Sequence, residues 1–310
     1  MRILVLGAGA TGGYFGGRLA ESGADVTFLV RPRRAAQLAA NGLQVRSPHG
    51  DVDIKPISHI GRADSAYDLV LLSCKAYDLD SAIEMIAPAV GANTVVLPVL
   101  NGMSHIDTLR AKFGDSVVGG FCIISATLDN EGVIRHLNDA HTIKYGELAG
   151  GKSARIDAID AVMKKAKMNS VASENIVNDM WEKWVMISSL AAVTTLFRAN
   201  IGEVASAPYG ERIAAKLFDE CVEVARGNGI ALREQFISSN RSRLIDRTST
   251  LAASMLRDMQ SGSRVESDHI IGALIDRAKA KSVSVPILET AYCNLKVHEA
   301  KAATPAAAAR

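Results

Sequence analysis

The sequence predicts an α/β domain built on a parallel sheet, followed by an all-helical domain. Short apolar runs alternate with helical segments through the first half of the chain, a pattern typical of strands buried on both faces. From about residue 175 onward only helical periodicity remains. The polar stretch "KMNSVASEN" at 167–175 separates the two textures, so we expect domains at 1–173 and 174–310.

The elements of the first domain follow in order. "RILVLGA" predicts an N-terminal strand, "GYFGGRLAESG" a helix and "DVTFLV" a second strand. Later apolar runs predict further buried strands of the same sheet at 67–73, 93–100 and 116–126. "EGVIRHLN" (131–138) and "HTIKYGEL" (141–148) predict two antiparallel strands that close this sheet. At the other end of the chain, the alanine-rich residues 302–310 are expected to fray.

Composition excludes several classes of protein. Lys and Arg number 35 against 33 for Asp and Glu, so we expect no nucleic-acid or anionic membrane partner. No apolar window is long enough to span a bilayer, and the N-terminus reads as a strand rather than a signal peptide. The cysteines are scattered and the histidines lack ligand spacing, which favours a reduced, cytoplasmic protein without a metal. A homodimer is compatible with the sequence.

The segment "GAGATG" matches the pattern G-x-G-x-x-G directly after the first predicted strand and at the start of a helix. That context indicates a Rossmann dinucleotide-binding domain, with the phosphates at the helix N-terminus. The alternative is a glycine-rich turn without a ligand. The expected cofactor-binding residues of this loop are Gly7, Ala8, Gly9, Ala10, Thr11 and Gly12.

The second strand ends in "RPRR", where an NAD-preferring enzyme would place a carboxylate for the ribose 2′-hydroxyl. Arg31, Arg33 and Arg34 instead match a 2′-phosphate in charge and geometry. The sequence therefore predicts NADP(H), although a solvated basic loop is the alternative reading.

Residues 178–197 predict a helix that is apolar on nearly every face, with Glu182 and Lys183 in its first turns. A lysine in this setting must be paired, extend its ammonium to water, or serve the chemistry. The helix alone leaves these alternatives open. Glu182 points about 100° away from Lys183 and is expected to be a solvent-facing charge.

Several motifs in this order resemble those of the ketopantoate reductase (2-dehydropantoate 2-reductase) family. They are the glycine loop with Arg31, "SCKAYD" at 73–78, "LNGM" at 100–103, "WEKW" at 181–184 and "SMLRDMQSGSRVESD" at 254–268. The resemblance implies a Rossmann domain plus a helical domain, with the active site in the cleft between them.

The resemblance also implies roles for individual residues. Lys183 would be the catalytic lysine that hydrogen-bonds the ketone oxygen and supplies the proton, with Glu220 near it. Lys75 and Asn101 would lie on the cofactor side, and Asn101 would also contact the substrate. Ser254 and Glu266 would bind substrate, and Glu266 would further serve catalysis and contact the cofactor. Without the resemblance, Lys75 and Asn101 could be a surface lysine and a turn residue, and Ser254 and Glu266 plain helix-surface residues.

The chain departs from the family at Ile187, Ala191 and Ile201, where the family usually carries asparagines. Residues four and eight positions after Lys183 share its helix face, so one wall of the expected site has become apolar. Ser188 and Ser189 lie on other faces and would compensate only partly. Loss of such amides weakens the match to a polyhydroxylated substrate.

The resulting hypothesis is NADPH-dependent reduction of a small 2-oxo acid to the 2-hydroxy acid. The substrate would be ketopantoate, which belongs to pantothenate biosynthesis, or a less polar 2-oxo acid or ketone. An enzyme that works in the oxidative direction is a further alternative, since the fold does not fix direction. A non-catalytic NADPH-binding sensor is the alternative from another class.

Overall fold

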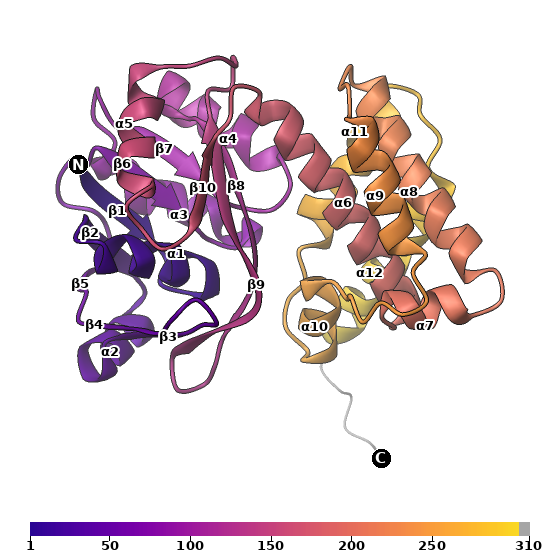
Figure 1. Cartoon of the computed structure of the whole chain (residues 1–310), viewed down its shortest axis with the longest axis horizontal. Helices are drawn as coiled ribbons and strands as arrows, with labels where there is room; N and C mark the ends of the chain where they lie inside the picture. Colours follow the sequence, from indigo (N-terminus) through magenta and orange to yellow (C-terminus); the bar gives the residue numbers. More distant parts are fainter. Residues whose placement is uncertain (304–310) are drawn as a thin grey trace. The chain divides into compact units, whose positions relative to one another are not determined.

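The computed structural model describes residues 1–303 and divides into two compact units. Unit 1 comprises Met1–Leu100 and His105–Val177, and unit 2 comprises Asn101–Ser104 and the chain from Asn178 onward. Figure 1 shows unit 1 as strands and helices and unit 2 as helices alone. Residues 302 and 303 continue a helix, and the rest of the segment expected to fray lies outside the described residues.

Sheet A of unit 1 is the predicted parallel sheet, with strand order β5-β2-β1-β6-β7. Its strands are β1 (Arg2–Leu6), β2 (Asp25–Val30), β5 (Ile57–Ile60), β6 (Leu69–Leu72) and β7 (Val95–Pro98). All neighbours pair in parallel. The strand order turns back at β1, so the crevice at the carboxyl ends of β1 and β6 is the topological switch point where ligands bind.

Helices connect and cover the strands of this sheet. They are α1 (Ala10–Glu21), α2 (Pro32–Asn41), α3 (Leu79–Ile86), α4 (Ser104–Phe113) and α5 (Ala154–Met163). A 3₁₀ turn, Ala76–Asp78, lies between β6 and α3. The α/β fold class predicted from the sequence is thus confirmed for this part of the chain.

A second sheet, which the sequence reading missed, makes up the rest of unit 1. Sheet B contains β3 (Leu43–Arg46), β4 (Val52–Ile54), β8 (Gly119–Leu128), β9 (Val133–Gly146) and β10 (Asn169–Ala172). The prediction that 116–126 belongs to the parallel sheet holds only at its start, where Val117 forms an isolated parallel bridge with Val96 of β7; from Gly119 onward the run is β8, which pairs antiparallel with β9. Likewise, 131–138 and 141–148 do not close sheet A; they form the single long strand β9 (Figure 1).

A bulge explains why β9 looks like two strands in the sequence. Ile124 pairs with His141 and Ala126 with His136. Residues 137–140 of β9 therefore lie opposite Ser125 alone on β8. Asn138 accepts a hydrogen bond from the Ser125 N–H there, at 3.3 Å. A bulge of this kind bends a strand without ending it, whereas polar residues in a sequence read as a turn.

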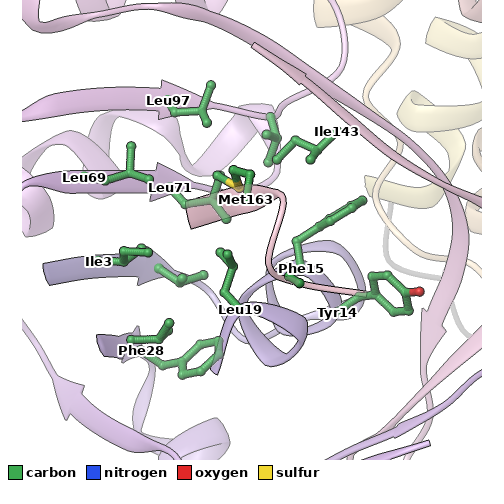
Figure 2. Close-up of a cluster of buried hydrophobic side chains, with 14 of the residues drawn as sticks. Ile3, Tyr14, Phe15, Leu19, Phe28, Leu69, Leu71, Leu97, Ile143 and Met163 are labelled. Carbon is green, nitrogen blue, oxygen red and sulfur yellow. The ribbon is translucent and has the colours of Figure 1, made fainter. Parts of the chain in front are cut away.

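Helix α1 packs against both sheets, and its glycines make this possible. A Cβ at Gly13 would lie 2.3 Å from Ile134 of sheet B, and a Cβ at Gly16 would lie 2.7 Å from the ring of Phe28 in sheet A. Figure 2 shows Tyr14, Phe15 and Leu19 of α1 among the buried side chains of this core. Any larger residue on these faces would push the helix away from a sheet.

Unit 2 consists of helices around α8. They are α6 (Ile176–Phe197), α7 (Ile201–Ser206), α8 (Gly210–Gly227), α9 (Glu234–Leu244), α10 (Ser254–Gln260), α11 (Ala273–Ala280) and α12 (Pro286–Ala303). Helix α8 packs against α7, α9, α11 and α12. A π-helical turn, Asp268–Gly272, leads into α11. None of the helices within residues 1–303 is long and apolar enough to cross a bilayer.

Three histidines stack in unit 1 beside α1. The rings of His49 and His141 lie 3.7 Å apart and nearly parallel, and His136 lies 6.0 Å from His141. The Tyr14 hydroxyl hydrogen-bonds His141 Nδ1 at 2.9 Å, and the fully buried Arg18 lies nearby. Burial lowers the pKa of His141, and the charges of His49, His136 and Arg18 lower it further.

We therefore predict that acid destabilises this chain partly through His141. Below pH about 6.5, the ordinary histidine pKa, the unfolded chain binds a proton that the folded chain does not, so unfolding becomes more favourable as pH falls. His141→Gln should lose less of its unfolding midpoint temperature than the wild type between pH 7.5 and 5.5. His59→Gln, on β5, is the control, and an equal acid loss in wild type and both variants would contradict the prediction.

Candidate active site

The glycine loop lies where β1 ends, pressed against the end of β6. Gly7 has φ +92°, and its N–H donates to Leu29 O at 2.9 Å. A Cβ at Gly7 would lie 2.7 Å from Ser73 O, and a Cβ at Gly12 would lie 2.2 Å from Gly7 O. These two positions therefore require glycine for backbone conformation and close packing.

Gly9 has a different role in the loop. A Cβ there would meet no protein atom within 4 Å, and no side chain caps the start of α1 at this residue. The first N–H groups of a helix have no partner inside it, and the helix dipole favours an anion there. The residues of the loop thus fit the pyrophosphate of a dinucleotide, with Ala10 and Thr11 in the first helical turn.

A cavity of about 490 Å³ extends from this loop along the carboxyl ends of β1, β2 and β6. Its volume falls within the range of sites for small ligands and cofactors. Predicted cofactor residues that line it are Gly7, Ala8, Gly9, Arg31 and Lys75. Asp129 and Asn130, from the turn between β8 and β9, add a wall that the sequence reading did not foresee.

The arginines after β2 differ in their surroundings. Arg31 is 65% exposed and pairs with Asp78 at 2.8 Å, which raises the arginine pKa. Arg33 is exposed, and both line the cavity. Arg34 is buried: its Nε donates to Ala8 O at 2.8 Å and its Nη1 to Gly132 O at 2.9 Å. Arg34 therefore ties the glycine loop to the turn between β8 and β9, and Arg31 and Arg33 are the exposed cations of the cavity.

Lys183 and Asn101 meet within unit 2. The lysine Nζ donates to Asn101 Oδ1 at 2.9 Å, and the lysine is half-buried on α6 between the buried residues Glu182 and Trp184. Asn101 follows β7 in the chain, in the "LNGM" segment. An amide oxygen orients the ammonium without cancelling its charge. Of the alternatives left open by the sequence, pairing is the one observed.

His269 joins this group, and the sequence reading assigned it no role. Its ring hydrogen-bonds the backbone of Asn101, and its backbone oxygen would lie 2.8 Å from a Cβ at Gly102. Burial lowers the pKa of His269, against the opposing effects of Glu266 and the Asn101 hydrogen bond. Glu266 lies just before the helical segment that contains His269, and their three-residue spacing was the available signal.

The carbonyl of Ile270 links α6 to this segment. It accepts hydrogen bonds from Trp184 Nε1 at 2.8 Å and from Ser188 Oγ at 3.1 Å. Ile270 lies in the π-helical turn, and such turns occur often at functional sites. The residue next to Lys183 is thus bonded to the residue next to His269, which sets the register of the two segments.

The remaining predicted site residues fare differently. Glu266 is half-buried and close enough to His269 to affect its pKa. Ser254 is the exposed first residue of α10, and its role in substrate binding stays a prediction. Glu220 accepts hydrogen bonds from the N–H groups of Ile287 and Leu288, so its carboxylate caps the first turn of α12.

The expectation that Glu182 faces solvent is wrong. Glu182 is 3% exposed and accepts hydrogen bonds from the backbone and side chain of Arg233 at 2.9 Å. Arg233, which precedes α9, also pairs with Asp179. The turn of about 100° from Lys183 carries Glu182 toward α9 instead of water.

The three apolar residues at the positions of the family's asparagines are largely covered in the folded chain. Ala191 and Ile201 are buried and Ile187 is half-buried. Ser188 donates to the Ile270 carbonyl, and Ser189 donates to Val185 O at 2.7 Å. Both hydroxyl hydrogens are used within the protein, so neither serine replaces the missing amides as a donor.

Comparison with known proteins decides the family. The ketopantoate reductase PanE/ApbA family matches residues 3–150, and the C-terminal region of the same family matches residues 175–299. An uncharacterized oxidoreductase, YkpB of Bacillus subtilis (strain 168), is 37% identical over 302 residues, which are 97% of this chain and 100% of the relative. The chain belongs to the ketopantoate reductase PanE/ApbA family. It is an oxidoreductase that uses a nicotinamide dinucleotide, as the glycine loop predicts.

Solved structures of other proteins share the fold. A 2-dehydropantoate 2-reductase from Methylococcus capsulatus superposes with TM-score 0.86 at 25% identity, over 99% of each chain. A D-mandelate dehydrogenase, solved with NADH and anilino(oxo)acetate, gives TM-score 0.87 at 23% identity, over 98% of this chain and 100% of that one. No group of three or more His, Cys, Asp and Glu side chains within residues 1–303 is placed to hold a metal.

We predict that the Glu182–Arg233 pair contributes to stability. Arg233→Ala leaves a buried carboxylate without its guanidinium, which should lower the free energy of unfolding by about 2 kcal/mol, within the range for hydrogen bonds to charged groups. Urea unfolding measures this.

Arg241→Ala is the matched control, because it breaks an exposed pair with Asp219 and should cost no more than about 1 kcal/mol. Equal destabilisation of the two variants would mean that burial of Glu182 does not increase the contribution of the pair to the free energy of unfolding.

Proposed function

We propose that this chain reduces a small 2-oxo acid to the 2-hydroxy acid with NADPH, in the cytoplasm. The observation that carries the proposal is the contact of 2.9 Å between Lys183 Nζ and Asn101 Oδ1, which holds an ammonium in a fixed, half-buried position. The glycine loop and its cavity support the dinucleotide half of the reaction.

Lys183 would act on the substrate oxygen. NADPH, when bound, would supply the hydride for the carbonyl carbon, and negative charge would develop on the carbonyl oxygen. The Lys183 ammonium hydrogen-bonds that oxygen and transfers a proton to it, which stabilises the transition state more than the ground state. Asn101 orients the ammonium, and His269 in turn holds the backbone of Asn101.

Arg31 supports the choice of NADPH over NADH. It is an exposed guanidinium that lines the cavity, where a 2′-phosphate can accept charge-assisted hydrogen bonds. Arg34 is held by backbone carbonyls and serves the shape of the loop. We assign Lys75, which also lines the cavity, to the cofactor, and Ser254 and Glu266 to the substrate.

The substrate is proposed to be ketopantoate or a 2-oxo acid with a less polar side chain. Ile187, Ala191 and Ile201 support the second choice, because they offer no hydrogen bonds to substrate hydroxyls. The D-mandelate dehydrogenase, which shares the fold, was solved with an oxo acid that carries an anilino group. Turnover of ketopantoate would place the chain in pantothenate biosynthesis.

A panel of 2-oxo acids tests the substrate. We predict that at least one acid with a plain alkyl side chain matches ketopantoate in kcat/KM, measured by NADPH absorbance. A preference for ketopantoate of about a thousandfold, equivalent to about 4 kcal/mol, would contradict the inference that the apolar residues favour a less polar substrate. Tight NADPH binding without oxidation by any acid would favour the sensor, and turnover of only hydroxy acids with NADP⁺ would favour the oxidative direction.

Replacing Lys183 tests the mechanism. Lys183→Ala should lower kcat by about 10²–10⁴, the range for loss of a positioned general acid. Binding of NADPH to the full chain, measured by fluorescence, should change little.

Lys279→Ala, an exposed lysine of α11, is the control and should keep wild-type turnover. A Lys183→Ala variant with more than about a tenth of wild-type kcat, above that range, would remove the lysine from the chemistry.

Replacing Arg31 tests cofactor choice. Arg31→Ala should weaken NADPH by about 1.5–3 kcal/mol, the value of a charge-assisted hydrogen bond, and NADH by much less. Calorimetric titration of both cofactors measures the difference. Arg62→Ala, an exposed arginine of unit 1, should change neither, and equal losses for the two cofactors in Arg31→Ala would show that Arg31 does not bind the 2′-phosphate.

A further inference from the structure

Arg31 is paired with an acid within the cavity. Arg31 follows β2, and Asp78 ends the 3₁₀ turn after β6, so their contact of 2.8 Å joins segments that follow the two strands flanking β1. Both residues line the cavity. The guanidinium expected to bind a 2′-phosphate therefore already has an anionic partner.

Asp78 does not cap the helix that it precedes. Its φ of −103° and ψ of 4° differ from the extended backbone of a capping residue, and its side chain accepts no hydrogen bond from the first turn of α3. The carboxylate pairs with Arg31 instead, so this salt bridge is its interaction in the cavity.

We propose that Asp78 sets how strongly the cavity prefers a 2′-phosphorylated dinucleotide. The proposal rests on the proposed use of NADPH. The Asp78 carboxylate occupies one side of the Arg31 guanidinium and repels a phosphate that approaches the other. Binding of the 2′-phosphate must therefore displace Asp78 or tolerate its charge, whereas a 2′-hydroxyl meets no such repulsion. Asp78 therefore reduces the difference in binding affinity between NADPH and NADH.

Asp78 is distinguished from the other acid of the cavity by its partners. Asp129 accepts hydrogen bonds from Val133 N at 2.8 Å and from Arg135 Nε at 2.8 Å, which commits its carboxylate to the turn between β8 and β9. Arg34, the buried arginine, donates to backbone carbonyls, and Asp129 acts on it only through its charge. The Arg31–Asp78 salt bridge is therefore the contact in which an acid of the cavity competes with a phosphate.

The experiment compares two ligands that differ only in the 2′-phosphate. Calorimetry on the full chain gives the affinities of 2′,5′-ADP and 5′-AMP, and their ratio measures recognition of that phosphate. Asp78→Asn keeps the shape of the side chain and removes its charge, so this ratio should rise about tenfold, equivalent to about 1.4 kcal/mol. Asp80→Asn, which removes an exposed charge two residues away on α3, should change the ratio less than about twofold, a fraction of a kcal/mol.

The variants separate failure of this inference from failure of the proposed cofactor choice. If Asp78 acts through Arg31, the double variant Arg31→Ala/Asp78→Asn should have the low ratio of Arg31→Ala alone. If the affinity ratio falls in Arg31→Ala but is unchanged or lower in Asp78→Asn, the proposed role of Asp78 is wrong. The proposed use of NADPH then still holds. No preference for 2′,5′-ADP in wild type, with no effect of Arg31→Ala, would overturn the cofactor choice itself. Thermal unfolding confirms that each variant is folded.

Discussion

The close approach of helix α1 to both sheets of unit 1 is the constraint on which the dinucleotide half of the molecule depends. Gly13 and Gly16 let the helix contact Ile134 on one side and Phe28 on the other. Because the helix cannot move away from either sheet, its N-terminus stays fixed beside the end of β1. Arg34 adds a second restraint, since it bonds Ala8 of the loop and Gly132 in the turn between β8 and β9. A turn that connects two strands of sheet B thus helps to position the loop after β1 of sheet A.

In unit 2 the Lys183 ammonium is positioned by a different means, through hydrogen bonds to backbone atoms. The Ile270 carbonyl, bonded by Trp184 and Ser188, holds the π-helical turn against α6. His269 bonds the backbone of Asn101, and the Asn101 side chain bonds Lys183. Lys183 is therefore positioned at both ends, by the packing of its helix and by an amide that is itself held in place. Pre-organisation of this kind lowers the cost of orienting a proton donor.

The parts of the fold and site that the sequence predicted are those with short-range causes. The parallel strands, the glycine loop and the helices after residue 175 each follow from patterns within one segment. Sheet B was missed because its pairing joins distant segments, and the polar bulge near Asn138 imitates a turn. Glu182 was misplaced for a similar reason, since its partner Arg233 lies far along the chain. His269 escaped notice because its significance depends on Asn101.

Parts of the site have a residue type or backbone conformation that is locally unfavourable, and they lie where ligands are expected to bind. Gly9 takes the entropic cost of glycine although no protein atom requires it. The segment at Ile270 adopts a π-helical turn in place of the more stable α-helix. Sequences generally satisfy local and global preferences together, so such departures concentrate where a ligand supplies the missing interaction. In this chain they coincide with the cavity of unit 1 and with the surroundings of Lys183 in unit 2.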